Sequence, residues 1–314
     1  MTIQQSVIKC NPLYKILNLI KSNFPELFLI NSFGRPRKYK VGNILAFMIY
    51  KSRISNLSFR KIANFLKNDF VALKILGFDK VPDFTILFKI YKKYLEKNIN
   101  IFLKKIGTQL CKNEYTFYLD SSSLVTSKFD KEAKVGKSTR INWYYGYKLH
   151  LICSRKGIPI SFNITTANIH DSKCEELITS LGELNQECDV IADKGYDTSK
   201  LLKHAKEHGI KLICPLNKRK AKKIELENIK CTLRKENYVY LETREGKSRY
   251  SKRWEIERLF GNLKENYSID NHRVRGLSRK YMNVSFKLLL FTIEKVTTLL
   301  KIIFYFCNTL YRKL

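Results

Sequence analysis

Apolar residues at helical spacing dominate the first third of the chain. The clearest segments cover residues 12–20, 41–50, 58–66 and 84–105, with few strand-like alternations. Ser58 stands where it can cap the third segment, and Asp83, after Pro82, stands where it can open the fourth. We therefore predict an all-helical N-terminal region over residues 1–113, whose pattern fits a DNA-binding helix-turn-helix and a plain helical bundle equally well.

From Tyr115 onward the pattern changes to short apolar runs that are typical of strands. Three runs come first, at residues 115–125, 144–154 and 158–166, and a turn at Lys156 and Gly157 joins the last two as a hairpin. They are followed by a helix over 171–184, a strand over 188–193, a helix over 198–208 and a strand over 211–216. This order predicts an α/β fold in which helices flank a mixed sheet.

Two further segments complete the expected organisation. Residues 217–249 are the least regular, contain a lysine-rich run at 218–223, and predict a small insertion with a hairpin. Residues 284–311 are strongly apolar, but four charged residues interrupt them, which favours a long buried or oligomer-forming helix over a membrane span. We expect an α/β domain over 114–273 and a C-terminal helical segment over 274–314.

The charge of the chain indicates a polyanionic partner. The 314 residues include 59 Lys and Arg against 28 Asp and Glu, and the resulting formal charge of +31 is costly unless counter-charge is bound. Nucleic acid is the natural partner, because no signal peptide, lipidation pattern or unbroken apolar span supports an acidic membrane surface instead. The eight cysteines form no C-x-x-C pair and mostly lie in apolar runs, so we expect buried free thiols in a reducing cytoplasm.

Four polar residues share one predicted helix face. At about 100° per residue, Tyr250, Arg253, Glu257 and Lys264 fall in one narrow sector beside an apolar face. Glu255 projects away from this sector, so the spacing favours Glu257 as the functional acid. The alternative interpretation is a solvated face held by i, i+4 ion pairs.

Two more carboxylates follow predicted strands. Asp120 comes after the run YTFYL, and Asp193 comes after CDVIA. Either one could simply cap a turn, but together with Glu257 they offer three hard oxygen ligands on a basic chain. Such a set suits two Mg²⁺ ions that clamp the attacking and leaving oxygens of a phosphodiester. Arg253 would then grip a phosphate with two nitrogens, while Lys264 acts as a point charge further along the strand.

These motifs together resemble one known family. The spacing from Tyr250 through Arg253 and Glu257 to Lys264 is similar to the Tyr-Arg-Glu-Lys signature of bacterial and archaeal insertion-sequence transposases of the DDE type. The segments LDSS, WYYGYKLH, IPISFNITTANIHDS and ADKGYD match that family in the same order, as does the helical front. The resemblance covers most of residues 55–270.

The resemblance implies a ribonuclease-H-like catalytic domain in which Asp120, Asp193 and Glu257 bind two Mg²⁺ ions, for which Mn²⁺ can substitute. The other three residues of the signature would hold phosphates of the transposon ends. The implied reaction is metal-dependent hydrolysis at those ends, followed by transfer of the freed 3′-hydroxyl into target DNA. A homodimer in a synaptic complex, associated with the nucleoid, is expected as well.

Weaker signals remain open at this point. Lys148 and His150 alternate along a predicted strand, and we expect Lys148 to contact DNA because its charge suits that partner. Asp171 precedes a predicted helix and is interpreted as its N-cap. The short interval between Asp193 and Glu257 leaves a DNA hairpin intermediate undecided. A nuclease or resolvase without strand transfer and an inactive DNA-binding relic are the alternative functions.

Overall fold

The chain divides into two compact units. A computed structural model describes residues 8, 11–29, 37–53, 58–111, 114–182, 187–218 and 225–311, with side chains up to residue 298. One unit combines Met1–Ile106, Tyr267–Ile269 and Met282–Leu314, and the other combines Gly107–Asn266 and Asp270–Tyr281.

The regular elements in the described part of the first unit are all helices, which confirms the predicted N-terminal helical region. Its elements are α2 (Pro12–Asn23), η1 (Pro25–Phe28), α3 (Val41–Lys51), α4 (Phe59–Lys67), α5 (Phe70–Leu76), α6 (Phe84–Ile90), the π-helical turn η2 (Tyr91–Leu95), most of α7 (Ile99–Leu110) and most of α13 (Leu277–Tyr311). The segment predicted as one helix over 84–105 is therefore divided among α6, η2 and α7.

Local capping explains where several of these helices begin. Ser58 Oγ accepts a hydrogen bond from the backbone N–H of Lys61 at 3.3 Å, and Asp83 Oδ1 accepts one from Thr85 at 2.8 Å. Gly77 ends α5 in the left-handed conformation, at a φ of 62°. Ser58 and Asp83 are the positions at which the sequence predicts these helices to begin.

Charged residues that interrupt the apolar run of α13 are satisfied within the first unit. Glu294 forms an ion pair with Arg53 at 2.8 Å and accepts a hydrogen bond from the hydroxyl of Tyr267. Lys287 is fully buried and donates to the backbone carbonyl of Ser268 at 2.6 Å. Among the described residues, no helix has both the length and the apolar character needed to cross a membrane.

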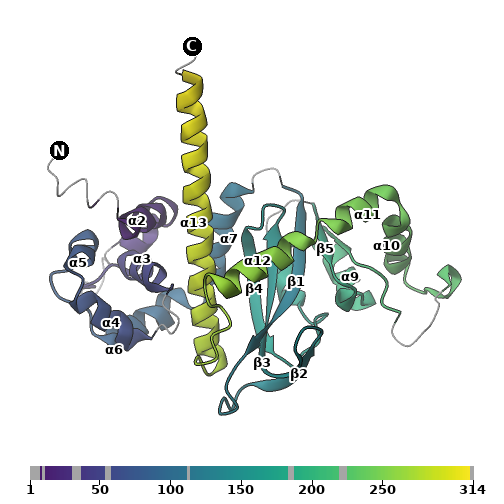
Figure 1. The fold of residues 1–314 in the computed structure, drawn as a ribbon, viewed down its shortest axis with the longest axis horizontal. Coiled ribbons are helices and arrows are strands. Elements are labelled where there is room, and N and C mark those ends of the chain that lie inside the picture. Colours follow the sequence, from purple (N-terminus) through teal and green to yellow (C-terminus); the bar gives the residue numbers. More distant parts are fainter. Residues whose placement is uncertain are drawn as a thin grey trace. The chain divides into compact units, whose positions relative to one another are not determined.

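A six-stranded mixed sheet forms the centre of the second unit (Figure 1). Its strands are β1 (Thr116–Val125), β2 (Lys134–Ser138), β3 (Asn142–Ser154), β4 (Pro159–Thr166), β5 (Cys188–Ala192) and β6 (Ile210–Ile213). The order is β2-β3-β1-β5-β6, and β4 pairs with the later part of β3. β1 runs antiparallel to β3 and parallel to β5. The predicted fold class is thereby confirmed, whereas β2 was not predicted because its residues are mostly exposed and give little apolar signal.

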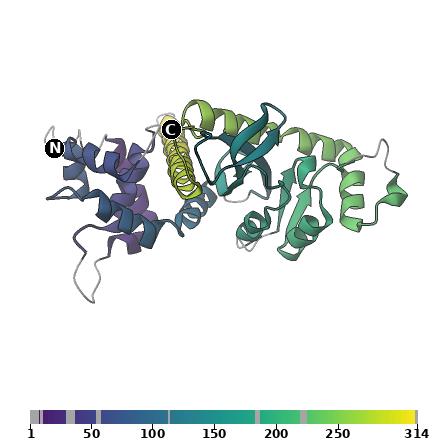
Figure 2. The ribbon, with the colours of Figure 1, turned by 90° about the horizontal axis from the view of Figure 1, so that it is seen from below.

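Helices cover both faces of this sheet. They are α8 (Glu175–Gly182), η3 (Lys194–Tyr196), α9 (Ser199–Glu207), η4 (Leu226–Asn228), α10 (Thr232–Glu242), α11 (Arg244–Ser251) and α12 (Trp254–Glu265). Figure 2 shows α11 and α12, in light green, on one side of the strands and α8 and α9, in teal, on the other. α12 contacts β1 directly.

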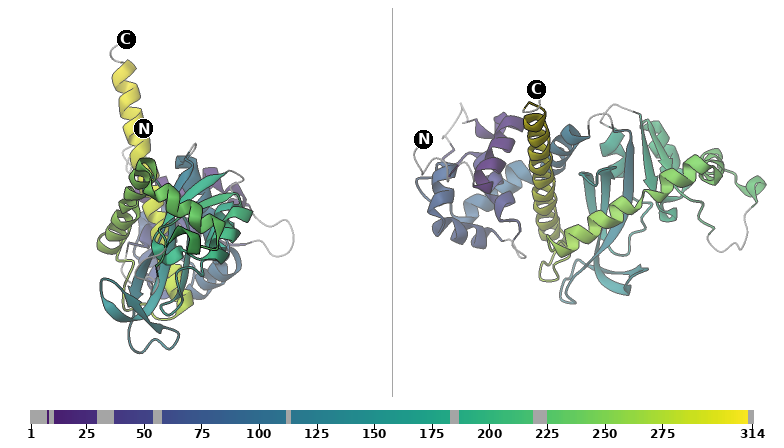
Figure 3. Two further views of the ribbon diagram at one scale, coloured as in Figure 1. Left: turned by 90° about the vertical axis from the view of Figure 1, so that its right-hand side faces the viewer. Right: turned by 45° about the horizontal axis from the view of Figure 1, so that its top comes forward.

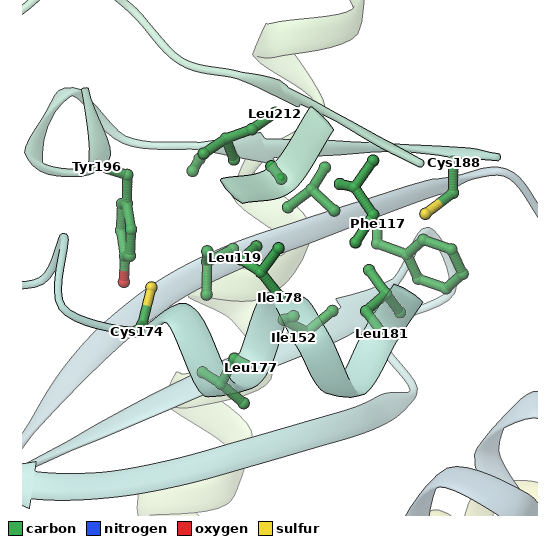
Figure 4. Packing of buried hydrophobic residues seen from close by; sticks show 14 of the residues in the cluster. Phe117, Leu119, Ile152, Cys174, Leu177, Ile178, Leu181, Cys188, Tyr196 and Leu212 are labelled. Carbon is green, nitrogen blue, oxygen red and sulfur yellow. The ribbon is translucent and has the colours of Figure 1, made fainter. Parts of the chain in front are cut away.

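The main core lies between the sheet and α8 and α9. Phe117 and Leu119 of β1 pack with Ile178 and Leu181 of α8 in one buried cluster (Figure 4). Free cysteine thiols are part of this cluster, as expected for cysteines in apolar runs. Because side chains alternate along a strand, Asp120 projects from the opposite face of β1, on the side of α12.

The hairpin predicted within residues 217–249 is wrong, because residues 232–251 form α10 and α11. The run YVYL has the alternation and aromatic content of a strand, but long-range contacts hold it in a helix. Asn237 donates to the backbone carbonyl of Leu212 at 2.9 Å, and Arg234 pairs with the buried Asp197 at 2.7 Å. Residues 219–223 of the lysine-rich run lie outside the described residues.

Candidate functional site

Two of the predicted acids lie side by side on neighbouring parallel strands, Asp120 in the middle of β1 and Asp193 directly after β5. In the pairing of β1 with β5, Leu119 is opposite Ala192, so Asp120 and Asp193 occupy the next positions on the two strands. Burial raises the pKa of Asp120 to about 6; the charge of Arg253 opposes this rise, and the charge of Asp193 adds to it. The two carboxylates therefore influence each other. The prediction that a strand ends before Asp193 is confirmed, but the prediction that one ends before Asp120 is wrong, because residues 121–125 pair with β3 and continue β1.

Arg253 connects the acid on the sheet to the acid on the helix. Its Nη1 donates to Asp120 Oδ2 at 2.9 Å, and its Nη2 donates to Glu257 Oε1 at 2.7 Å. The Arg253 and Asp120 side chains are only 17% and 20% exposed, whereas that of Glu257 is 44% exposed. One cation thus balances two carboxylates, and the bond to Asp120 is the more shielded of the two.

The predicted helix face persists although the helix is interrupted. α11 and α12 are separated by Lys252 and Arg253, but both residues keep right-handed helical dihedral angles, and the two helices run nearly in line (Figure 3). Arg253 and Glu257 consequently meet as an i, i+4 pair, and the Arg253 guanidinium lies 5.9 Å from the ring centroid of Tyr250. Burial raises the pKa of Tyr250, which is half-buried beside this arginine.

Hydrogen bonds between distant segments hold α11 against the sheet. Arg249 donates to Thr116 Oγ1 at 2.9 Å and to Asp189 Oδ2 at 2.6 Å, near the starts of β1 and β5. Since α12 follows α11 almost in line, the hydrogen bonds of Arg249 also help to fix the direction in which α12 presents its side chains.

Glu255 faces away from the site, as its helical position predicts. Its carboxylate pairs with Arg258 at 2.6 Å, and it is not among the residues that line the cleft over the acids. Glu257 does line that cleft. The structure therefore confirms the prediction that Glu257 faces the site and Glu255 does not.

A cleft of about 440 Å³ opens over the acids. Its charged lining residues are Asp120, Asp193, Glu257, Asp171, Lys137, Arg140, Lys148, Arg253 and Lys264. All three predicted acids and three of the four predicted DNA-binding residues are thus brought together. Tyr250 is the exception among the described residues, because it lies behind Arg253 and does not contribute to the lining.

Lys148 reaches the cleft, but it is already paired. Its Nζ donates to Asp171 Oδ1 at 2.9 Å and to the backbone carbonyl of Ile169 at 2.7 Å. The interpretation of Asp171 as an N-cap is wrong, because α8 begins only at Glu175 and the carboxylate of Asp171 binds this lysine instead. A DNA contact by Lys148 stays a prediction.

Three charged cleft residues were missed as site residues by the sequence reasoning. Lys137 and Arg140 belong to the β2–β3 hairpin, which has too little apolar signal to be predicted. Asp171 was noticed only as a helix cap, although the pair His170-Asp171 at a strand exit was the available signal. Lys264 was predicted, and burial lowers its pKa; the charge of Asp270 opposes this shift, and the smaller effect of Arg140 adds to it.

The donor set fits a divalent cation by its chemistry. Three carboxylates offer hard oxygen ligands, and the buried Asp120 needs a cationic partner. In the described part of the chain, however, no group of three or more His, Cys, Asp or Glu side chains is placed to hold a metal ion. Arg253 occupies the position between Asp120 and Glu257 and supplies the counter-charge there.

Comparison with known proteins agrees with this geometry. The sequence profile of the family described as "Transposase DDE domain" matches residues 112–293, more than half of the chain, and this region includes all three acids. One curated relative is the "Transposase for insertion sequence element IS1106" of Neisseria meningitidis serogroup B, which is 36% identical over 87 residues. That match covers 28% of this chain and 29% of the relative, so the chain spans less than a third of that protein's length. The chain therefore belongs to the transposase family that is defined by the DDE domain.

Proposed function

We propose that the protein is an insertion-sequence transposase. It hydrolyses a phosphodiester at each end of its element and then transfers the freed 3′-hydroxyl into target DNA. The observation that carries this proposal is the single cleft in which Asp120, Asp193 and Glu257 lie among several cations. The family and the name of the IS1106 relative support the same function.

Transposases with a DDE domain generally use divalent metal ions. Asp120, Asp193 and Glu257 would hold Mg²⁺, or Mn²⁺ in its place. Bound ions of this kind activate water at neutral pH and stabilise charge on the phosphoryl oxygens. The protein holds two of the acids at adjacent positions of the sheet, within β1 and directly after β5, and the third on α12, which packs on β1.

Arg253 has a double role in this proposal. Arg253 forms hydrogen bonds to both Asp120 and Glu257. The two carboxylates can therefore bind the same metal ion only after Arg253 has released at least one of them. The released guanidinium can then bind a DNA phosphate through two nitrogens.

Other cations of the cleft would follow the DNA backbone. Lys264 is half-buried and interacts with the charges of both Asp270 and Arg140, and a phosphate would relieve the repulsion between the two cations. Lys148 would have to exchange Asp171 for a phosphate, and Tyr250 would contribute its hydroxyl. The helical N-terminal region would bind DNA, and a homodimer would pair the two ends of the element on the nucleoid.

A cleavage and joining assay tests the proposal. Labelled DNA that flanks the gene is incubated with the protein and Mg²⁺, Mn²⁺ or EDTA, together with a second duplex as target. The native chain is expected to cut and to join a 3′ end only with metal. Asp193→Asn and Glu257→Gln should abolish both steps while DNA binding persists, because they remove metal ligands rather than phosphate contacts.

Glu255→Gln is the matched control, since Glu255 lies two residues away on the same helix and faces Arg258. It should leave cutting and joining intact. Cutting without joining would favour a nuclease, and DNA binding without metal-dependent cutting would favour an inactive relic. An equal loss in Glu255→Gln would refute the assignment of the helix face.

A further inference from the structure

A buried hydroxyl group without a partner lies close to the cleft. Tyr196 is 1% exposed, and its hydroxyl oxygen forms no hydrogen bond of normal geometry within the described residues. Burial raises the pKa of Tyr196 well above its usual value, so the group stays protonated and is a hydrogen-bond donor; Ser121, which lines the cleft, is close enough to oppose that rise. A buried donor without a partner is costly, and its retention needs a physical explanation.

The segment that contains Asp171 lies against Tyr196. A Cβ at Gly195, the residue before Tyr196, would lie 3.5 Å from Asp171 Oδ2. The hydroxyl group of Tyr196 points toward Cys174, which follows Asp171 by three positions (Figure 4). After burial and the effect of Cys174, the charge of Asp171 adds to the rise in the pKa of Tyr196, and it does so more strongly than that of Asp120. Asp171 is thus the carboxylate that interacts most strongly with the unpartnered donor.

Asp171 binds a different partner in the structure. Its Oδ1 accepts a hydrogen bond from Lys148 Nζ at 2.9 Å, and the same nitrogen donates to the backbone carbonyl of Ile169 at 2.7 Å. The side chains of Lys148 and Asp171 are only 13% and 28% exposed. Because this pair is largely shielded from water, the departure of Lys148 would leave an uncompensated carboxylate, which is costly unless another donor takes its place.

We propose that Tyr196 is a positioning residue that donates a hydrogen bond to Asp171 once a DNA phosphate has taken Lys148 from this carboxylate. The proposal rests on the proposed function, because that function supplies the phosphate. A hydrogen bond to the charged form would stabilise the released carboxylate and keep it from recapturing Lys148. The donor that has no partner in the DNA-free protein is therefore the one that the DNA-bound protein needs.

His150 offers the other unpartnered atom in this neighbourhood. It follows Lys148 by two positions on the same face of β3, and its Nε2 lies 2.9 Å from Thr165 Oγ1, whereas its buried Nδ1 has no hydrogen-bond partner in the part of the chain that the structure describes. A neutral imidazole carries a proton on Nδ1 in only one of its two tautomers, but the phenol of Tyr196 always has a hydrogen to donate. We therefore assign the hydrogen bond to Tyr196.

Urea unfolding in EDTA, without DNA, tests the assignment through a change of sign. Tyr196→Phe removes only the hydroxyl group, so in the native chain it should raise the urea midpoint by removing a buried donor without a partner. Lys148→Met frees Asp171. In that chain Tyr196→Phe should instead raise the equilibrium constant of unfolding by about 10- to 150-fold, the range for a hydrogen bond to a charged group. The same sign in both chains would overturn the proposal, and adding Asp171→Asn should remove most of the loss.

Two other buried side chains serve as controls. The hydroxyl group of Tyr147 donates to Asp130 at 3.0 Å, on the opposite face of β3 from Lys148. Tyr147→Phe should therefore lower the urea midpoint by the same amount in the native chain and in Lys148→Met. If His150→Gln shows the change of sign and Tyr196→Phe does not, His150 is the donor and the role of Tyr196 is refuted.

DNA binding in EDTA provides a second measurement that does not require Lys148→Met to fold. A labelled duplex from the flank of the gene is titrated with each protein and followed by fluorescence anisotropy. Tyr196→Phe should weaken binding by about 10- to 150-fold although it stabilises the free protein, and Tyr147→Phe should leave the affinity unchanged. An unchanged affinity of Tyr196→Phe would overturn the proposal. Failure of metal-dependent cutting in the native chain would count against the proposed function alone, since neither measurement contains metal.

Discussion

Replacing Arg253 by Gln should destabilise the second unit in the absence of metal. The change removes both charge-assisted hydrogen bonds and leaves Asp120 as a shielded carboxylate without a cation. Breaking a buried ion pair from one side costs about 3–5 kcal/mol, and the residual exposure of Asp120 places this site near the lower end, at about 3 kcal/mol. The loss at Glu257 adds no more than about 1 kcal/mol, because that side chain is largely solvated.

The destabilisation should depend on pH with a defined sign. The pKa of Asp120 in the folded protein is raised to about 6 by burial, above its value in an unfolded chain. Between about pH 4 and pH 6 the folded state therefore binds more protons, and the free energy of unfolding rises as the pH falls through this window. Since the protonated carboxyl needs no cation, the loss caused by Arg253→Gln should shrink to about 1 kcal/mol at pH 5.

Urea unfolding in EDTA, followed by tryptophan fluorescence at pH 7.5 and pH 5.0, measures this effect. Both tryptophans belong to the second unit, so the signal reports on the unit that contains the site. Lys247→Gln is the control, because Lys247 and its partner Glu242 are each 62% exposed, so the loss of this ion pair should lower the free energy of unfolding by less than about 1 kcal/mol. Added Mg²⁺ should stabilise Arg253→Gln more than the native chain, in which the arginine competes for the same carboxylates.

Native-like stability of Arg253→Gln at pH 7.5 would refute the counter-ion role of Arg253. An equal loss at pH 7.5 and pH 5.0 would show that the effect comes from packing instead of charge. If Mg²⁺ raises the free energy of unfolding of both proteins equally, Arg253 does not compete with the metal ion for the carboxylates.

Two further predictions concern the stability of β3 and α12. Burial lowers the pKa of His150 to about 4. As the pH falls, this histidine is therefore protonated in the unfolded chain before it is protonated in the folded chain. The free energy of unfolding should decrease by up to about 3 kcal/mol between pH 6.5 and pH 4. The difference in urea midpoint between the native chain and His150→Gln should therefore narrow as the pH falls, and a constant difference would contradict this. Gly146→Ala should cost about 1–3 kcal/mol or more, because its Cβ would overlap the backbone oxygen of Leu124. Gly261→Ala in α12, where a Cβ meets nothing within 4 Å, should instead stabilise by about 0.5–1 kcal/mol; thermal denaturation of both variants checks the opposite signs.

The local sequence pattern was sufficient to predict those strands and helices whose own residues show apolar periodicity or capping residues. The run YTFYL is apolar and typical of a strand, so β1 could be predicted, whereas the position of Asp120 within the strand depends on the pairing of residues 121–125 with β3. Ser58 and Asp83 mark helix starts by side-chain chemistry that acts within three residues. The helical periodicity around Glu257 separated it from Glu255, because the direction of a side chain on one helix depends only on its spacing.

Tertiary structure decided the features that depend on contacts between distant segments. The sequence predicts a hairpin within residues 217–249, but residues 232–242 form α10, in which Asn237 and Arg234 bond to other elements. β2 has no strong pattern of its own and exists because it pairs with β3. The roles of Lys148 and Asp171 likewise changed once their ion pair across 23 positions was seen.

The sequence by itself determined the fold class, the helical front and the three acids that later proved to line one cleft. Only the tertiary structure decided that Arg253 binds two of those acids and that Lys137 and Arg140 line the same cleft. The physical reason is the distance along the chain over which each interaction acts. Periodicity and capping act within a few residues along one element, whereas the bond between Arg253 and Asp120 joins residues 133 positions apart and forms only when the sheet and α12 have packed together.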